Sequence, residues 1–286
     1  MLNHLLFGFA AFLLLTGAAP APNAGANAIA AARGLRTVVL DPGHGGTNLG
    51  AVARVSGLGY EKQHTLRIAR LIAGHLRAEG ITVFLTRESD VDMTLADRVK
   101  YANSHRADVF VSIHLNSTEK PGPVGHETFF LALESSDEAA RRLVNFENTE
   151  GQGQVLAQAR PADDDVAGIL LDLTQNQAHE DAQSLAACVQ RRLSKQSPFP
   201  NRGVLQAPFV VLMGAAMPAV VIESGFLNHP KEGHFVTSDE GQARIARGIA
   251  DGILDFGHRV VAGRQPRANP PDAPGESTVP EVPFHP

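Results

Sequence analysis

Short apolar runs alternate with amphipathic segments along most of the chain. In residues 62–78, apolar side chains recur at positions 66, 69, 72, 73 and 76, which is the spacing of one helix face. Thr94 and Asp97 have the spacing of a helix N-cap and its capping-box partner. The predicted strands are Thr37–Leu40, Ile81–Thr86, Val109–Ile113, His126–Leu131, Gly203–Gln206, Phe209–Leu212 and Ala219–Ile222. The predicted helices are Lys62–Ala78, Thr94–Ser104, Asp137–Asn148, Ala178–Leu193 and Gly241–Phe256.

Strands that alternate with helices are typical of a mostly parallel, twisted sheet with helices on both faces. We therefore predict a single α/β domain over residues 35–260. The chain has 286 residues, 43% of them hydrophobic, which is enough for one sizeable core. Open sheets of this kind bind ligands at the C-terminal edge of their strands, so we expect the active site there.

The two ends of the chain differ from this domain. The apolar stretch 5–15 is too short to span a bilayer, and small residues follow it at 19–21 and 26–28, as in a cleaved secretory signal. We predict a signal peptide at 1–28, a linker at 29–34 and a disordered, Pro-rich tail at 261–286. The protein is then exported and periplasmic; the alternative is an uncleaved membrane anchor.

Charge and cysteine content narrow the picture further. A net charge of −5 argues against nucleic acid as a partner. Cys188 is the only cysteine, so no disulfide can form within the chain, and its apolar neighbours indicate a buried structural thiol. An exported domain without disulfides must rely on its core or on a metal.

Three predicted strands are followed closely by side chains that handle metals or protons. These are His44, in a glycine-rich turn, His114 and Glu223. Two neutral imidazoles together with carboxylates suit a catalytic zinc. The alternatives are a phosphate-binding or plain turn around His44 and a hydrogen-bonded core histidine at position 114, although no Lys-Ser/Thr pair completes a phosphate loop.

Two carboxylates have competing interpretations. Glu61 opens a helix, where the helix dipole alone favours an acid, and His64 lies one turn further on as a rival ligand. Glu223 follows an apolar strand, and its desolvation would raise its pKa and suit it to general acid–base work. The alternative is an ion pair with Arg98 or Arg202.

Other polar residues near these motifs are less decisive. Arg87 and Arg98 either position a substrate or brace the loop, and Asn116 can orient the ring of His114 or contact substrate. The remaining histidines, including His126, are expected at the surface.

Taken together, six ordered motifs resemble the zinc-dependent N-acetylmuramoyl-L-alanine amidases, the type-3 amidase family of cell-wall hydrolases. The motifs are Leu40–Gly46, Glu61, Leu85–Arg87, Leu95–Arg98, Ser112–Asn116 and Ile222–Asn228. The resemblance implies one zinc ion per chain, held by His44, Glu61 and His114, with Glu223 as the catalytic glutamate. It also implies hydrolysis of the amide between N-acetylmuramic acid and the L-alanine of the stem peptide in peptidoglycan. A zinc peptidase or deacetylase acting on the same polymer, or a non-catalytic wall-binding protein, is the alternative.

The segment from about 134 to 197 is longer than a sheet connection requires. It resembles the regulatory insertion of the cell-division members of the family, in which a helix blocks the site and a glutamate takes the open position on zinc. Glu147 is the first candidate for that glutamate and Glu150 the second. The resemblance implies a degenerate LytM-type activator protein, and the apolar residues of the run 169–173 would be its docking surface. We predict a monomer.

Overall fold

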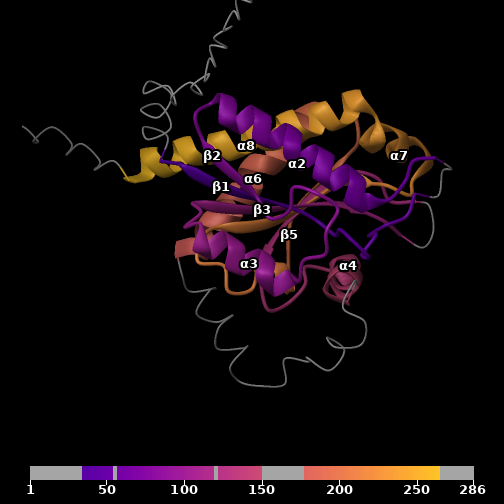
Figure 1. The fold of residues 1–286 in the computed structure, drawn as a ribbon, viewed down its shortest axis with the longest axis horizontal. Coiled ribbons are helices and arrows are strands. Elements are labelled where there is room, and N and C mark those ends of the chain that lie inside the picture. The colour runs from indigo at the N-terminus through magenta and orange to yellow at the C-terminus, as the bar shows by residue number, and fades with distance from the viewer. Residues whose placement is uncertain (1–33, 54–56, 119–121, 150–176, 265–286) are drawn as a thin grey trace, which may run out of the picture.

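The computed structural model describes residues 34–53, 57–118, 122–149 and 177–264. Their centre is one six-stranded sheet with the strand order β2-β1-β3-β6-β4-β5 (Figure 1). The strands are β1 (Thr37–Pro42), β2 (Thr82–Leu85), β3 (Val109–Asn116), β4 (His126–Leu131), β5 (Asn201–Ala207) and β6 (Ala219–Phe226). The helices are α2 (Glu61–Ala78), α3 (Leu95–Ser104), α4 (Glu138–Thr149), α6 (Gln177–Gln196), α7 (Pro230–Thr237), α8 (Asp239–Arg264) and a short 3-10 turn, η1 (Val210–Leu212).

Most of the sheet is parallel. β1 pairs in parallel with β2 and β3, and β3 pairs in parallel with β6. β4 runs antiparallel to β6 and parallel to β5. The structure thus confirms the predicted α/β fold, a mostly parallel sheet with helices on both faces.

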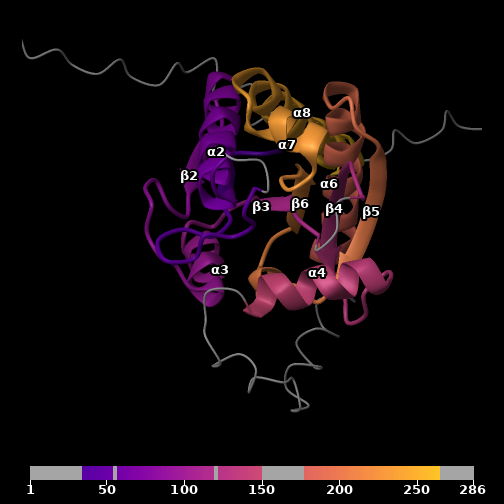
Figure 2. The ribbon, with the colours of Figure 1, turned by 90° about the vertical axis from the view of Figure 1, so that its right-hand side faces the viewer.

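Helices cover both faces because side chains alternate between them along each strand. On one face, Val38, Leu40 and the odd-numbered positions of β3 pack against α2, α6 and α8. On the other, Val39, Phe110 and Val221 pack in a second core with residues of α3, α4 and η1. Figures 1 and 2 show α4 near the C-terminal ends of the strands, on the same side of the sheet as α3.

Several predicted elements are correct in kind and wrong in extent. β1, β3 and β6 run on to Pro42, Asn116 and Phe226, so His114 and Glu223 lie inside strands and not after them. The run 209–212 is not a strand but contains η1. Helix α7 was not predicted, and α8 extends to Arg264, beyond the predicted start of the tail at 261.

The expectation that His126 lies at the surface is wrong. The residue is fully buried in β4, and α6 lies against that strand: Gln190 of α6 donates to the carbonyl of His126 through Nε2 at 2.7 Å. Burial lowers the pKa of this imidazole, which favours the neutral form.

The predicted insertion, 134–197, includes a core element. Leu185, Cys188, Val189 and Leu193 of α6 are fully buried against the sheet and α8, so α6 belongs to the catalytic domain. Cys188 is a buried free thiol, as predicted. Glu150 and the run 169–173 lie outside the described residues, as do the predicted signal peptide, the linker up to 33 and the tail from 265.

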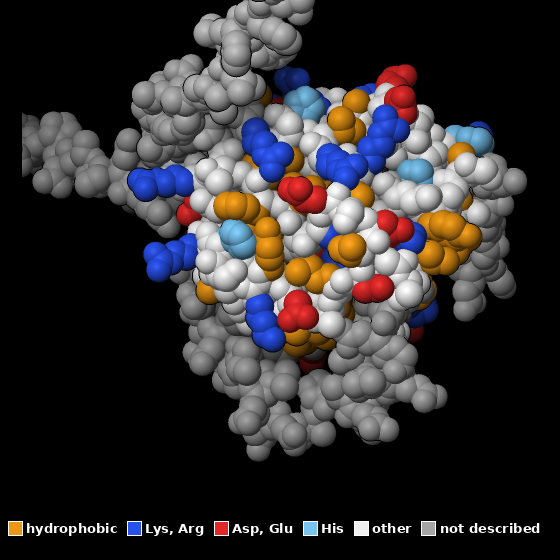
Figure 3. All heavy atoms as spheres, viewed as in Figure 1, with side chains coloured by type: hydrophobic (Ala, Val, Ile, Leu, Met, Phe, Trp, Pro, Cys, Tyr) orange, Lys and Arg blue, Asp and Glu red, His pale blue; other side chains and the backbone are white. Residues whose placement is uncertain are grey.

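Figure 3 shows positive and negative side chains interspersed over one face of the molecule. Among the described residues, no helix combines the length and apolar character that crossing a membrane requires.

Candidate metal centre

His44 occupies a strained turn directly after β1. Its φ is 60°, a left-handed conformation that costs a non-glycine residue of order 1–3 kcal/mol and that clusters at functional sites. Nδ1 of His44 lies 3.0 Å from Oδ1 of Asn48. Because an amide oxygen can only accept, this contact places the ring proton on Nδ1 and leaves Nε2 as the ligand atom.

Glu61 is the first residue of α2 and is fully buried. Its Oε2 accepts the backbone N–H of Ala51 and its Oε1 that of Leu115, each at 2.8 Å. Two backbone donors and the N-terminal end of the helix stabilise the carboxylate form and fix its direction.

His114 lies in β3 and faces the same point. Its Nδ1 is 3.2 Å from Oε1 of Glu61, while Nε2 of His44 is 3.0 Å from Oε2 of the same carboxylate. The two imidazole rings are 4.8 Å apart, centroid to centroid, and meet edge to face. One carboxylate therefore bridges two imidazole nitrogens from different parts of the chain.

Glu147, in the last turn of α4, closes the cluster from the opposite side. Its Oε2 is 3.1 Å from Nδ1 of His114 and 3.5 Å from Nε2 of His44. The next residue, Asn148, fixes the end of α4, because it donates to the carbonyl of Pro208 at 3.0 Å and accepts from the N–H of Val210 at 2.9 Å.

These four side chains fit a metal ion. Their ligand atoms all lie within 4.8 Å of one another, and all four residues are buried. Tetrahedral zinc bonds of about 2.0–2.1 Å place neighbouring ligand atoms about 3.3 Å apart. The His–Glu distances of 3.0, 3.5, 3.2 and 3.1 Å match that spacing, and the nitrogen and oxygen donors are those that zinc prefers.

Charge inside the cluster is strongly coupled. Burial alone lowers the pKa of His114, but the carboxylates of Glu147 and Glu61 outweigh it and raise this pKa well above the usual histidine value. Burial likewise raises the pKa of Glu61, yet the two imidazoles reverse this and leave it lowered. The carboxylates are thus favoured in their charged form, and they in turn favour a positive charge between them and the imidazoles.

Two glycines make room for the imidazoles. A Cβ on Gly43 would lie 2.5 Å from Cε1 and Nε2 of His114. Gly50 has a φ of 66°, and a Cβ there would lie 2.5 Å from Cδ2 of His44 and 2.6 Å from Oε2 of Glu61. The backbone therefore packs directly against the ligand side chains.

Glu223 lies beside the cluster in β6, where its Cα pairs with that of His114 across the sheet. It is fully buried, and within the described part of the chain neither carboxylate oxygen has a hydrogen-bond partner. Burial raises its pKa well above the usual glutamate value; His114 opposes this, and the nearby carboxylates of Glu147, Glu61 and Glu127 add to it. A buried carboxyl group with a raised pKa and no fixed hydrogen-bond partner is a candidate for proton transfer.

The ion pairs considered for Glu223 do not form. Arg98 pairs with Asp41 at 2.6 Å and Arg202 with Glu127 at 2.7 Å. His64 is not part of the cluster either, since its Nε2 lies 2.6 Å from the carbonyl of Leu58 and its Nδ1 lies 2.9 Å from Nε2 of Gln242.

Comparison with known protein families assigns the chain that carries this centre to a family. Residues 38–255 match the profile of the type-3 amidases, described as N-acetylmuramoyl-L-alanine amidase. The chain belongs to this amidase family. It is therefore a hydrolase of the bacterial cell wall, active on peptidoglycan.

Curated relatives agree with this assignment. The chain is 32% identical to the N-acetylmuramoyl-L-alanine amidase AmiA of Escherichia coli K12, over 79% of this chain and 77% of that protein. It is 33% identical to the amidase AmiC of Neisseria meningitidis serogroup B, over 92% of this chain and 61% of the relative.

Solved structures share the fold. An N-acetylmuramoyl-L-alanine amidase from Clostridium difficile 630 has a TM-score of 0.59 at 29% identity, covering 78% of this chain and 97% of that one. The CwlD amidase of Clostridioides difficile, solved in complex with the GerS lipoprotein, has a TM-score of 0.57 at 25% identity, covering 77% and 98%.

In this amidase, Arg87 and Arg98 contact the backbone around the metal centre. Arg87 donates to the carbonyls of Pro42, Gly43 and Lys62 at 3.0, 2.8 and 2.8 Å. Arg98 donates to the carbonyls of Pro42 and His44, each at 2.8 Å. Both side chains are almost fully buried, and these contacts brace the turn that carries His44.

Three polar residues of the site were not predicted from the sequence. Asp41 is fully buried and accepts from Arg98, Thr86 and Ser112, and Asn48 orients His44. Glu127, in β4, accepts from Asn116 at 2.9 Å, so Asn116 contacts this carboxylate in place of the ring of His114. An acid inside the apolar run 126–131 is the one signal that could have pointed to Glu127.

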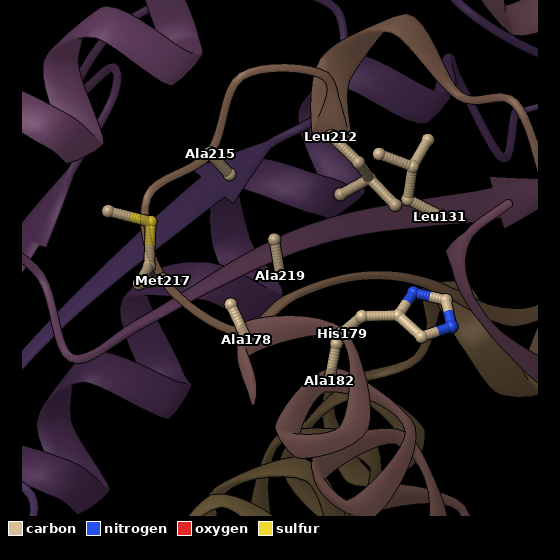
Figure 4. Close-up of a pocket in the computed structure, with 8 residues that line it drawn as sticks. All are labelled: Leu131, Ala178, His179, Ala182, Leu212, Ala215, Met217 and Ala219. Atoms are coloured by element: carbon tan, nitrogen blue, oxygen red, sulfur yellow. The ribbon is translucent and has the colours of Figure 1, made fainter. Parts of the chain in front are cut away.

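A separate hollow lies away from the metal centre, between α6, η1 and the strands (Figure 4). It is lined by Leu131, Ala178, His179, Ala182, Leu212, Ala215, Met217 and Ala219. Among its described lining residues, His179 is the one ionisable group, and its ring packs edge-on against Phe130 at 5.2 Å. The described lining of this apolar space thus holds none of the predicted site residues.

Proposed function

We propose that this amidase is an exported, periplasmic zinc enzyme that cleaves the amide between the lactyl group of N-acetylmuramic acid and the L-alanine of the stem peptide. The observation that carries the proposal is the buried cluster of two imidazoles and two carboxylates, with the unpartnered carboxylate of Glu223 beside it. The family assignment supplies the bond that is cut.

His44, Glu61 and His114 would hold the metal. Bound zinc supplies a Lewis acid that polarises the scissile carbonyl and lowers the pKa of water toward about 7. Asn48 and the backbone N–H groups of Ala51 and Leu115 keep two of these ligands in their orientation before substrate arrives.

Glu223 would move the proton. It takes a proton from the attacking water as the new C–O bond forms, and returns it to the amine nitrogen as the C–N bond breaks. Burial raises the pKa of this carboxyl group, which strengthens it as a proton acceptor, and the proton it accepts is the one it returns to the amine.

Glu147 would keep the enzyme at rest. Its carboxylate occupies the fourth corner of the ligand cluster, where water and substrate would otherwise enter. Release of α4 would then require a partner, for which we propose a degenerate LytM-type activator docking on the segment after α4, with the amidase acting as a monomer in cell separation. A lipoprotein bound to the CwlD relative is a precedent for partner binding in such proteins.

The test combines metal content with product analysis. Purified Glu147→Ala enzyme should contain one zinc per chain and release intact stem peptides from defined muropeptides by cleavage at the lactyl amide. Adding Glu223→Gln should lower turnover on the order of 10²-fold or more while zinc content stays the same. Glu232→Gln, which changes a buried carboxyl outside the cluster, should leave turnover unchanged and serves as the control.

Cleavage within the peptide, or release of acetate, would replace the proposal with the peptidase or deacetylase alternative. Protein that neither carries nor acquires a metal would refute it.

A further inference from the structure

Four polar side chains form a row across the sheet. His114 of β3 is paired with Glu223 of β6, and Glu223 is paired with Glu127 of β4. On β5, Asn201 pairs with His126 and Gly203 pairs with Glu127 of β4. Arg202 lies between these two, where the register of the strands shifts. Directly opposed residues on neighbouring strands point to the same face, so the metal centre and Arg202 are two ends of one line.

Arg202 is held rigidly yet keeps one edge available. Its Nε donates to Oε2 of Glu127 at 2.7 Å, and its guanidinium lies over the ring of Phe226 at 5.4 Å from the centroid. Its side chain is 29% exposed, and within the described residues Nη1 and Nη2 make no hydrogen bond. Two parallel N–H donors on a fixed guanidinium are suited to bidentate binding of a carboxylate.

This free edge lines a hollow of roughly 840 Å³ beside α4. Asn116, Glu127, Phe226 and Asn228 form part of its wall, and Phe146 of α4 forms another. Among the described residues that line it, the ionisable groups are the arginines at positions 142 and 202 and one acid, Glu127, which already pairs with Arg202. The hollow is therefore a favourable place for an added negative charge.

The hollow on the other side of the metal centre has the opposite character. It contains His44 and His114 together with four carboxylates, those of Asp41, Asp92, Asp97 and Glu147, and one arginine, Arg98. Asp41 is neutralised by that arginine, so the others dominate. With Glu147 withdrawn and a metal ion held by the imidazoles, Asp92 and Asp97 still line this hollow, and its one described arginine is already paired with Asp41. The hollow therefore offers no unpaired arginine to a peptide carboxylate, whereas an uncharged sugar needs none.

We propose that Arg202 binds a carboxylate on the second or third residue of the stem peptide, and so directs the peptide toward β5 and the glycan toward the acidic hollow. This rests on the proposed function, since it takes the lactyl amide to lie at the metal centre.

The distances agree with this assignment. Glu223 and Arg202 are two strand spacings apart, which is about 10 Å of backbone. An extended peptide covers about 3.3–3.6 Å per residue, so the second or third residue from the scissile bond reaches Arg202.

The test uses full-length Glu147→Ala enzyme and muramyl peptides that carry either a carboxylate or a carboxamide at the second or the third residue. We expect amidation at one of these positions to lower kcat/KM by ~10-fold to 100-fold, as loss of a charge-assisted pair does. In Arg202→Gln, kcat/KM for the carboxylate substrate should fall to that for the carboxamide substrate. The enzyme would then no longer discriminate between the two forms of the peptide.

Two further variants control for folding. The double variant Glu127→Gln/Arg202→Gln removes both members of the ion pair, so no buried carboxylate is left unpaired. It should also lose the discrimination between carboxylate and carboxamide peptides. Arg244→Gln is the matched control, because Arg244 makes the same kind of contacts, over the ring of Phe235 at 5.5 Å and with Glu240 at 3.5 Å, outside both hollows. It should keep full discrimination.

A second measurement is the affinity of the enzyme for the released peptide, determined by calorimetry for the carboxylate and for the carboxamide form. Equal kcat/KM for carboxylate and carboxamide peptides, or discrimination that survives both Arg202 variants, would overturn the proposal. If no substrate is cut at the lactyl amide, the proposed function fails, and peptide affinity alone then decides whether Arg202 is a carboxylate receptor.

Discussion

At the scale of single residues, the metal centre depends on residues that neither bind the metal nor transfer a proton. Gly43 and Gly50 leave space that the imidazoles and Glu61 fill, and Asn48 fixes the proton on His44. Loss of that space should disturb the ligands as much as loss of an orienting hydrogen bond does.

We predict that Gly43→Ala lowers zinc affinity by about 10-fold to 100-fold, because the added methyl group would displace the ring of His114. The measurement is competition with a chelating dye. Gly74→Ala is the matched control, since a Cβ there meets nothing within 4 Å. It should leave zinc affinity unchanged and stabilise α2 by up to about 1 kcal/mol. Equal zinc affinity in both variants would contradict the role given to Gly43.

The sequence predicts some of these residues and not others for a physical reason. His44, His114 and Glu223 stand out because each interrupts or ends an apolar run, and the structure brings them together. The role of Asp41 and of Glu127 becomes clear only from their partners on neighbouring strands and helices, Arg98 and Arg202, which no local pattern encodes; the one local sign is that Glu127 interrupts an apolar run.

At the scale of elements, apolar runs predict where strands lie but not where they end. β3 and β6 continue through His114 and Glu223 because the backbone ladder, which is independent of side-chain polarity, continues across the sheet. The run 209–212 has the same apolar character as a strand, but the chain turns there and Val210 bonds to Asn148 of α4 instead of a neighbouring strand. A short apolar run alone cannot distinguish these outcomes.

For α4, we predict that Glu147→Ala raises turnover in the absence of any partner by about 10-fold to 100-fold, because one charged contact with the metal centre is removed. The measurement is the rate of muropeptide cleavage. Glu138→Ala, on the same helix, is the control: its side chain is 57% exposed and its ion pairs with described residues are those with Arg141 and Arg142, so basal turnover should stay the same. Unchanged turnover in Glu147→Ala would refute autoinhibition.

At the scale of the whole molecule, Glu232 links α7 to the segment before β4. Its two carboxylate oxygens accept the N–H of Gly125 at 3.0 and 3.1 Å, across more than a hundred residues of sequence. Burial raises the pKa of this carboxyl to about 7. The folded protein therefore binds this proton more tightly than the unfolded chain does.

The stability contribution is thus fully present below about pH 4.5 and is lost as the pH rises through about 7. We predict that the free energy of unfolding of the native protein falls across this range by at most about 3 kcal/mol relative to Glu232→Gln. Urea unfolding of both proteins at a series of pH values measures this difference. Parallel pH profiles for the two proteins would show that Glu232 is not the group responsible.

The two hydrogen bonds of Asn148 act as a latch on α4. Each contributes only about 1 kcal/mol net, and the 10-fold to 100-fold effect expected for the Glu147 contact corresponds to about 1.4–2.8 kcal/mol, so withdrawing Glu147 costs a few kcal/mol while Ala140 and Val144 stay packed in the core. A protein that binds with micromolar affinity has about 8 kcal/mol available, well above what opening the latch costs. In the proposed resting state, an activator of modest affinity would therefore suffice to open this enzyme, and would release it again as soon as its local concentration drops.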